Sequence, residues 1–338
     1  MIRIAWAIAA LTLAAPSLAQ GTGEIRPVDG LYVMGIQHLA LTVGDIDETI
    51  AFYAKAVPVS VVRRYRVPGS QFPKALLSRR YKSVDIAVLA FPTGFVQLMD
   101  FEPGKAAAPV KRAVIGPGYN HFNFQSSSRD PAILRFKAAG LEVVSRFGKA
   151  DGVDIGGYGV RYAYGRDING IMIENESLDA PKRSEPVWLT HVANAAHDRD
   201  RMLAFYTTVV GRKPHRVVEQ ANRPRLDDVA GIDGVSIRGG WINVGNMDLE
   251  VWEYVLPRTP APIGDRKLDE VGISSVAFEV ADVKAQAARL KAADVRLAGN
   301  PCNVGGWQTQ YGYDPEGNIF AFVQRGKAPA QESVKVLR

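Results

Sequence analysis

The chain has 338 residues, of which 47% are hydrophobic and 22% are charged. These proportions exclude a disordered chain and a protein embedded in a membrane, and the length predicts two globular domains. A single cysteine excludes a disulfide framework and a cysteine-rich zinc or iron–sulfur site. The formal charge is +6, but the basic residues are scattered, so we expect no nucleic-acid partner.

The N-terminus has the pattern of an export signal. Arg3 precedes an apolar run over residues 4–15, and Ser17 and Ala19 place small side chains just before Gln20. This pattern predicts a signal peptide over residues 1–19, and therefore a periplasmic or secreted mature protein. The apolar run is shorter than the roughly 20 residues that a membrane-spanning helix needs, so we expect no stable membrane anchor.

Two segments of the chain resemble each other at a fixed offset. His38 and His191 each lie in an apolar run that predicts a strand, and they are 153 residues apart. The tripeptide Ala-Phe-Tyr follows each run, at residues 51–53 and 204–206, with the same offset. Asp45 and Asp198 precede these tripeptides, where an aspartate can cap the first turn of a helix. Self-similarity of this kind predicts a duplicated structural unit.

Each copy divides again into two smaller units. The segments 119–124 and 273–280 predict further strands followed by helices, and an Asp-to-Gly turn precedes a last strand in each half. We therefore predict an α+β fold of four paired βαβββ modules, near residues 33–105, 117–178, 187–257 and 270–326. Residues 179–186, with two prolines, form the expected linker between a first domain at 33–178 and a second at 187–326.

This organisation resembles the vicinal oxygen chelate superfamily, which includes glyoxalase I, methylmalonyl-CoA epimerase, extradiol dioxygenases and bleomycin- and fosfomycin-resistance proteins. The resemblance covers residues 33–326. In that family two modules pair so that their curved sheets form a cleft, and the first and last strands of each module hold one metal ion. The resemblance implies two such domains here, each built from the two modules of one half.

The resemblance also implies the metal ligands. In the first half, the ligand positions are occupied by His38, Gln97, His121 and Glu174. In the second half, they are occupied by His191, Glu250, Ser275 and Ala321. Serine is a poor ligand and alanine is none, so we expect the second domain to carry a degenerate site. The first domain is expected to bind one divalent ion, which could be Zn, Ni, Co, Mn or Fe(II).

The order His, Gln, His, Glu is similar to the ligand set of methylmalonyl-CoA epimerase, and bacterial-type glyoxalase I has Glu in place of Gln. In both families the metal binds a carbonyl oxygen and stabilises the enolate that forms when a base removes the neighbouring proton. The resemblance therefore implies an exported lyase or isomerase that acts on a small carbonyl compound. Glu174 would be both a ligand and the catalytic base.

Two alternatives remain open from the sequence. His38, His121 and Glu174 also form a two-histidine, one-carboxylate set, which extradiol dioxygenases use to hold Fe(II). Tyr164 matches the tyrosine of their signature and is a candidate catalytic residue, although Ile168 replaces the signature proline. The third hypothesis is a non-catalytic resistance-type protein that sequesters a ligand, which would not need the four donors.

Overall fold

The computed structural model describes residues 33–105, 107–221 and 223–334. The signal peptide expected over residues 1–19 lies outside the described residues. In the described part of the chain, no helix is long and apolar enough to cross a membrane.

The chain folds into four modules that each begin with a strand and a helix, which confirms the predicted α+β class. The first module contains β1 (Val33–Thr42), α1 (Ile46–Ala56), β2 (Ser60–Pro68), β3 (Ser83–Phe91) and β4 (Gly94–Asp100). The second contains β5 (Gly118–Ser127), α2 (Ala132–Ala139), β6 (Glu142–Val143), β7 (Val153–Asp154), β8 (Val160–Arg166) and β9 (Met172–Leu178).

The second half repeats this order with one added helix. The third module contains β10 (Val187–Ala195), α3 (Arg199–Val210), β11 (Arg216–Gln220), α4 (Pro224–Ala230), β12 (Ser236–Asn243) and β13 (Asp248–Leu256). The fourth contains β14 (Gly272–Val280), α5 (Val283–Ala292), β15 (Leu297–Val304), β16 (Trp307–Tyr313) and β17 (Ile319–Arg325). Short 3-10 helices lie at Gly69–Gln71, Lys74–Leu76 and Ala330–Glu332.

The modules pair differently from the expectation that each half forms its own curved sheet. The first and fourth modules share an eight-stranded sheet, in the order β15-β16-β17-β14-β1-β4-β3-β2. The second and third modules share a nine-stranded sheet, in the order β11-β12-β13-β10-β5-β9-β8-β6, with β7 paired to β8. The antiparallel pairs β1–β14 and β5–β10 make these joins, so each sheet contains strands from both halves of the chain.

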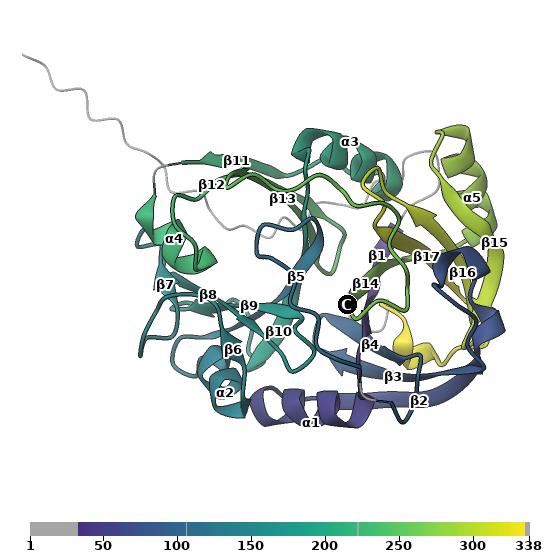
Figure 1. Cartoon of the computed structure of the whole chain (residues 1–338), viewed down its shortest axis with the longest axis horizontal. Coiled ribbons are helices and arrows are strands. Elements are labelled where there is room, and N and C mark those ends of the chain that lie inside the picture. The colour runs from purple at the N-terminus through teal and green to yellow at the C-terminus, as the bar shows by residue number, and fades with distance from the viewer. Residues whose placement is uncertain (1–32, 106, 222, 335–338) are drawn as a thin grey trace, which may run out of the picture.

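Helices connect modules that the sheets keep apart. Figure 1 shows α1 and α2 along one edge of the molecule and α3 and α5 near the opposite edge. Phe52 and Tyr53 of α1 pack on Phe136 of α2, with ring centroids 5.9 Å and 6.1 Å apart. The modules of one half therefore meet through their helices, while their strands pair with the other half.

The aspartates expected to cap the repeated helices do so. The Asp45 carboxylate accepts a hydrogen bond from the backbone N–H of Glu48 at 2.8 Å, and the Asp198 carboxylate accepts one from Arg201 at 3.0 Å. Each carboxylate satisfies a backbone donor that has no partner inside the helix. The cap fixes where each helix starts relative to the strand before it, and therefore how the helix packs on the sheet.

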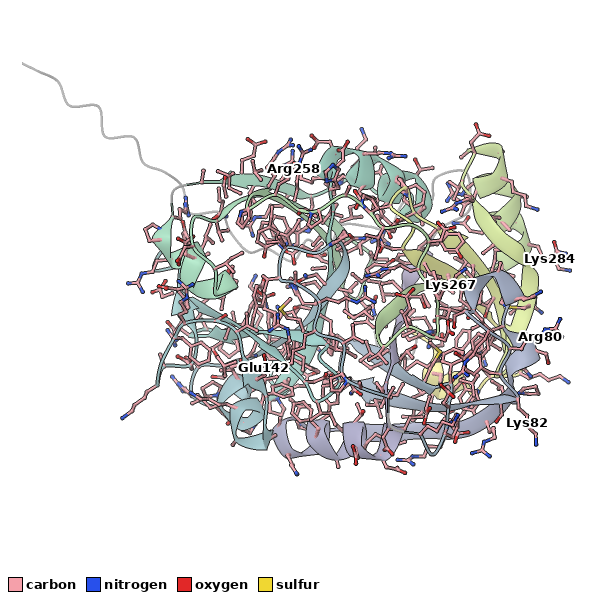
Figure 2. All side chains as sticks on the ribbon, viewed as in Figure 1. Arg80, Lys82, Glu142, Arg258, Lys267 and Lys284 are labelled. Carbon is pink, nitrogen blue, oxygen red and sulfur yellow. The ribbon has the colours of Figure 1, made fainter. Side chains whose placement is uncertain are left out.

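Basic side chains lie mainly on the outer surface. Arg80, Lys82 and Lys284 are exposed and extend outward at one end of the molecule (Figure 2). On β2, Arg66 donates to the carboxylate of Asp85 on β3 at 2.7 Å. Strand-edge ion pairs and solvation account for these basic clusters.

Candidate metal centre

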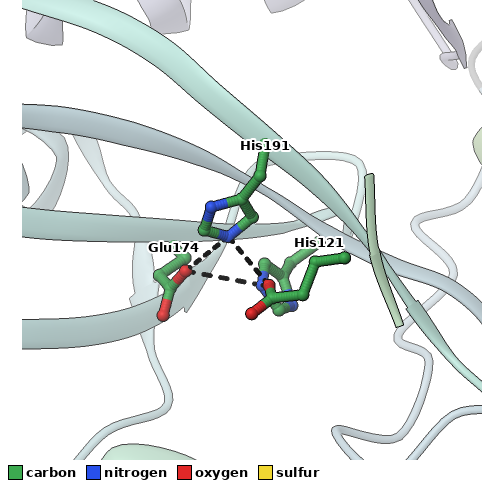
Figure 3. Close-up of side chains that lie close together, drawn as sticks. His121, Glu174 and His191 are labelled. Carbon is green, nitrogen blue, oxygen red and sulfur yellow. Dashed lines mark ion pairs between the residues drawn. The ribbon is translucent and has the colours of Figure 1, made fainter. Parts of the chain in front are cut away.

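Four donor side chains meet on one face of the nine-stranded sheet. The group consists of His121 on β5, Glu174 on β9, His191 on β10 and Glu250 on β13, and one ligand atom of each lies within 4.8 Å of the others. All four side chains are buried. Figure 3 shows His121, Glu174 and His191 directed toward a common point. In the part of the chain that the structure describes, this is the one group of three or more His, Cys, Asp or Glu donors.

The strand register brings these residues together. In the parallel β5–β9 pair Asn123 lies opposite Glu174, and in the β10–β13 pair Ala193 lies opposite Glu250. The antiparallel β5–β10 pair then sets Ala193 opposite His121. Because alternate residues of a strand share a face, these pairings place the four donors on neighbouring strands of one face.

The distances between donors suit a single divalent ion. His191 Nε2 lies 2.8 Å from Glu174 Oε2 and 3.1 Å from Glu250 Oε2, and His121 Nε2 lies 3.5 Å from each of the same oxygens. Ligands about 2.1 Å from an ion lie roughly 3 Å apart at adjacent positions. Despite these short distances, the buried atoms His121 Nε2, His191 Nε2 and Glu250 Oε2 make no hydrogen bond with suitable angles. An ion bound between them would satisfy all three.

A neighbouring amide fixes the orientation of His121. The Asn120 amide nitrogen donates to the carbonyl oxygens of Val114 at 2.8 Å and Ala113 at 3.2 Å. Its oxygen therefore faces His121 Nδ1, 3.0 Å away, and accepts the Nδ1 proton. A neutral imidazole with its proton on Nδ1 carries the lone pair on Nε2, which is the form that binds a metal.

The electrostatics of the cluster favour a cation. Burial acts most strongly on His191 and lowers its pKa, but Glu250 and Glu174 together outweigh burial and raise the pKa to about 10. The pKa of Glu174 is lowered in turn, because His121 and His191 outweigh the effect of burial. Two carboxylates thus stabilise positive charge on the imidazoles, and a divalent ion would supply that charge in place of protons.

Aromatic and apolar side chains surround the donors. The Tyr164 ring lies 4.9 Å from the His121 ring, between centroids. A hydrophobic cluster on the same side includes Met172, Tyr254 and residues of α4, such as Leu226. Burial and then the Glu174 charge raise the pKa of Tyr164 well above its ordinary value, so its hydroxyl keeps its proton.

The structure brings His121 and Glu174 together, but it does not add His38 and Gln97 to them. His38 lies on β1 and Gln97 on β4, both in the eight-stranded sheet. His191 and Glu250 contribute the other two donors of the cluster, although the sequence assigned them to a degenerate second site. The two-histidine, one-carboxylate set of His38, His121 and Glu174 is likewise divided between the two sheets.

The surroundings of His38 differ from those of the cluster. The Gln37 amide oxygen contacts His38 Nδ1, and burial lowers the pKa of His38 to about 3. The hydroxyl of Tyr65 donates to the side-chain oxygen of Gln97 at 3.4 Å. Ser275 and Ala321, from β14 and β17, contribute no carboxylate to this sheet. The four expected ligand positions of the eight-stranded sheet therefore lack the negative charge that a divalent ion requires.

The C-terminal segment packs on the eight-stranded sheet next to His38. Glu332 is buried, its carboxylate lies 3.3 Å from the Arg63 guanidinium, and the Trp307 indole donates to it at 3.2 Å. Gln37 donates to the backbone carbonyl of Glu332 at 2.7 Å. Gln37 thus contacts both His38 and the C-terminal segment.

Comparison with known proteins agrees with this architecture. Two family models of the glyoxalase/bleomycin resistance protein/dioxygenase superfamily match the chain, one over residues 37–164 and the other over residues 188–322. The chain belongs to this superfamily.

Relatives within the superfamily are distant. Lactoylglutathione lyase from Arabidopsis thaliana is 24% identical over 197 residues, which are 58% of this chain and 60% of that protein's own length. Glyoxalase I from Zea mays superposes with a TM-score of 0.61 at 19% identity, over 90% of this chain and 95% of the maize chain. A single-residue variant of the maize enzyme gives a TM-score of 0.60 at 18% identity, over 86% and 93% of the two chains. At these identities the structural similarity shows the fold.

Proposed function

We propose that this protein is a metal-dependent lyase or isomerase that transfers a proton next to the carbonyl group of a small substrate. The observation that carries the proposal is the buried group of His121, Glu174, His191 and Glu250 with its unpartnered donor atoms. Two imidazoles and two carboxylates suit Zn, Ni, Co, Mn or Fe(II). A divalent ion held there would withdraw electron density from a carbonyl oxygen and make the adjacent C–H bond more acidic.

The chain's own residues supply the remaining requirements. A carboxylate of the cluster, with Glu174 the favoured one, takes the proton from the carbon, and the C–H electron pair moves toward the carbonyl oxygen. The same carboxylate returns the proton to a neighbouring carbon in an isomerisation, or a leaving group departs in a lyase reaction. Tyr164 keeps its hydroxyl proton beside His121 and can donate a hydrogen bond to an oxygen of the substrate. The apolar wall excludes water from this exchange.

The first experiment is elemental analysis of the purified protein together with His191→Ala and His38→Ala. We expect about one equivalent of metal in the wild type and in His38→Ala, and loss of the metal in His191→Ala. Retention by His191→Ala together with loss in His38→Ala would contradict the site. Absence of metal from the wild type after reconstitution would leave the ligand-sequestering role.

The identity of the metal then selects the assay. With zinc, nickel, cobalt or manganese, we expect deuterium from solvent to enter candidate carbonyl compounds next to the carbonyl group. One equivalent of iron that supports oxygen uptake with catechols would instead indicate a dioxygenase. If Glu174→Gln folds like the wild type but loses the activity that was detected, that activity belongs to the metal centre.

Export is part of the same proposal. It is supported by the charged and apolar pattern of residues 3–19. Mass determination of the mature protein from a bacterial host should give a chain that begins at Gln20. A mature chain that retains residues 1–19 would contradict export by cleavage.

A further inference from the structure

One arginine beside the metal centre has no anionic partner. Arg216, on β11, is half-buried, and its guanidinium carbon lies 4.5 Å from the centroid of the Trp241 ring. Among the described residues, no carboxylate or carbonyl oxygen lies within hydrogen-bonding distance of this guanidinium. Stacking on an indole restricts the orientation of the planar group but leaves its N–H donors available.

The sheet register places Arg216 in the same row as a metal donor. Arg216 lies opposite Trp241 in the antiparallel β11–β12 pair, and Trp241 lies opposite Glu250 in the β12–β13 pair. Residues directly opposite each other in antiparallel strands present their side chains on the same face. Neighbouring strands are about 4.8 Å apart, so two strand spacings, roughly 10 Å, separate the backbones of Arg216 and Glu250. An extended arginine side chain covers much of that distance.

Two tyrosines of β8 lie beyond the donor strands, on the side of the sheet away from β11. Tyr162 and Tyr164, on β8, lie opposite Glu176 and Glu174 in the β8–β9 pair. Burial is the largest influence on the pKa of Tyr162 and raises it, whereas the Arg216 charge lowers it. The Arg216 charge therefore acts across the strands that carry the four donors, which lie between β11 and β8 in the sheet.

Arginines on the other face of the same strands are neutralised. Arg238, next to Gly239 on β12, donates to Asp200 at 2.7 Å and to Glu219 at 3.2 Å. Arg199, at the start of α3, donates to Asp200 at 2.7 Å. The carboxylates that pair with these two arginines, Asp200 and Glu219, lie on the helix side of the sheet. Arg216, on the face that carries the metal donors, remains for a group that the chain does not supply.

We propose that Arg216 binds a carboxylate of the substrate, so that the site takes a small carbonyl compound with an apolar body and a carboxylate at the end remote from the metal. This inference rests on the proposed function of the metal centre. The planar guanidinium can donate two parallel hydrogen bonds to a carboxylate, which gives both affinity and orientation. Arg216 is thus a specificity-determining residue, and Trp241 positions it.

The test uses the full chain loaded with one equivalent of zinc and calorimetric titration of three probes. Benzohydroxamate chelates a metal through two oxygens and has no other charge, and its 3-carboxy and 4-carboxy derivatives add the carboxylate. We expect at least one carboxylated probe to bind roughly 10- to 100-fold more tightly than benzohydroxamate, as hydrogen bonds between charged groups would give. In Arg216→Gln this difference should disappear, while metal content and benzohydroxamate affinity stay unchanged. Arg216→Lys should restore part of it.

The matched control is Lys213→Gln, which removes an exposed positive charge three residues away. It should keep the full preference for the carboxylated probe. A preference that survives in Arg216→Gln, or that falls equally in Lys213→Gln, would overturn the role of Arg216. A zinc-loaded wild type that binds none of the three probes would instead contradict the proposed function of the metal centre.

Discussion

The hydroxyl of Tyr53 donates to the carboxylate of Asp167 at 2.9 Å, and thereby connects α1 of the first module to the turn before β9 of the second. The second half repeats this bond, since Tyr206 donates to Asp314 at 3.0 Å. Both tyrosines belong to the repeated Ala-Phe-Tyr tripeptide, and both aspartates open the turn that leads into the last strand of a module. This bond holds the two modules of a half together although their strands belong to different sheets.

Removing the Tyr53 hydroxyl should weaken this connection. Tyr53→Phe deletes a buried donor to a carboxylate, and we expect the free energy of unfolding to fall by about 1–3 kcal/mol. Urea denaturation measures the change, and Tyr158→Phe, at an exposed tyrosine, serves as the control. Equal stability of the two variants would show that the Tyr53–Asp167 bond contributes nothing.

The Asp167 carboxyl should also make stability depend on pH. Burial, the largest influence, raises its pKa from an ordinary 3.8 to about 6, against the hydrogen bonds it accepts from Tyr53 and the backbone of Ile171 and Asn169. The folded chain therefore holds this proton more tightly than the unfolded chain. The resulting stabilisation is complete below pH 3.8 and is lost as the pH rises through about 6.

Comparison of the wild type with Asp167→Asn across pH 4 to 7 isolates this effect. The stability of the wild type relative to the variant should decline over that range, by on the order of 2–3 kcal/mol. Thermal or urea unfolding in buffers of constant ionic strength provides the measurement. A relative stability that rises with pH would mean that the hydrogen bonds to the carboxylate dominate over burial.

Asn120 should control metal affinity without touching the ion. Its amide oxygen accepts the Nδ1 proton of His121 and so directs the Nε2 lone pair to the cluster. Loss of such a supporting residue typically lowers metal affinity about 10- to 100-fold. Competition with a chromophoric chelator should show this decrease for Asn120→Ala. Gln37→Ala, which removes the corresponding neighbour of His38, should leave the affinity unchanged, and a decrease of similar size there would contradict the assignment.

Gly239 should be required for the position of the Trp252 indole. A β-carbon at this residue would lie 2.5 Å from the ring of Trp252, so the ring must move if the glycine becomes alanine. We expect Gly239→Ala to shift the tryptophan fluorescence and to cost about 1–3 kcal/mol of stability. In a Trp252→Leu background the same change should cost clearly less. An equal cost in both backgrounds would assign the effect to the backbone instead.

Much of this architecture could be predicted from local sequence patterns. The 153-residue offset identified the duplication, and the capping aspartates located α1 and α3. The resemblance to a known family, rather than a local pattern, pointed to His121, Glu174, His191 and Glu250 as ligand positions on first and last strands. The pairing of the modules could not be predicted in the same way. The four first strands are all buried on both faces, so nothing local to His38 or His121 distinguishes one partner strand from another. Pairing two modules of one half therefore divided the four donors incorrectly.

The antiparallel pairing of β1 with β14 has a consequence for how the chain acquires its structure. Ile36 and Phe278 are partners in this pair, so the contact closes a loop of more than two hundred residues. The entropy of loop closure and the general slowing of folding by long-range contacts make this a late event. β5 and β10 are much closer together in the sequence, so they can pair before β1 and β14 do. We therefore expect the metal-binding sheet to gain protection from hydrogen exchange before the eight-stranded sheet does.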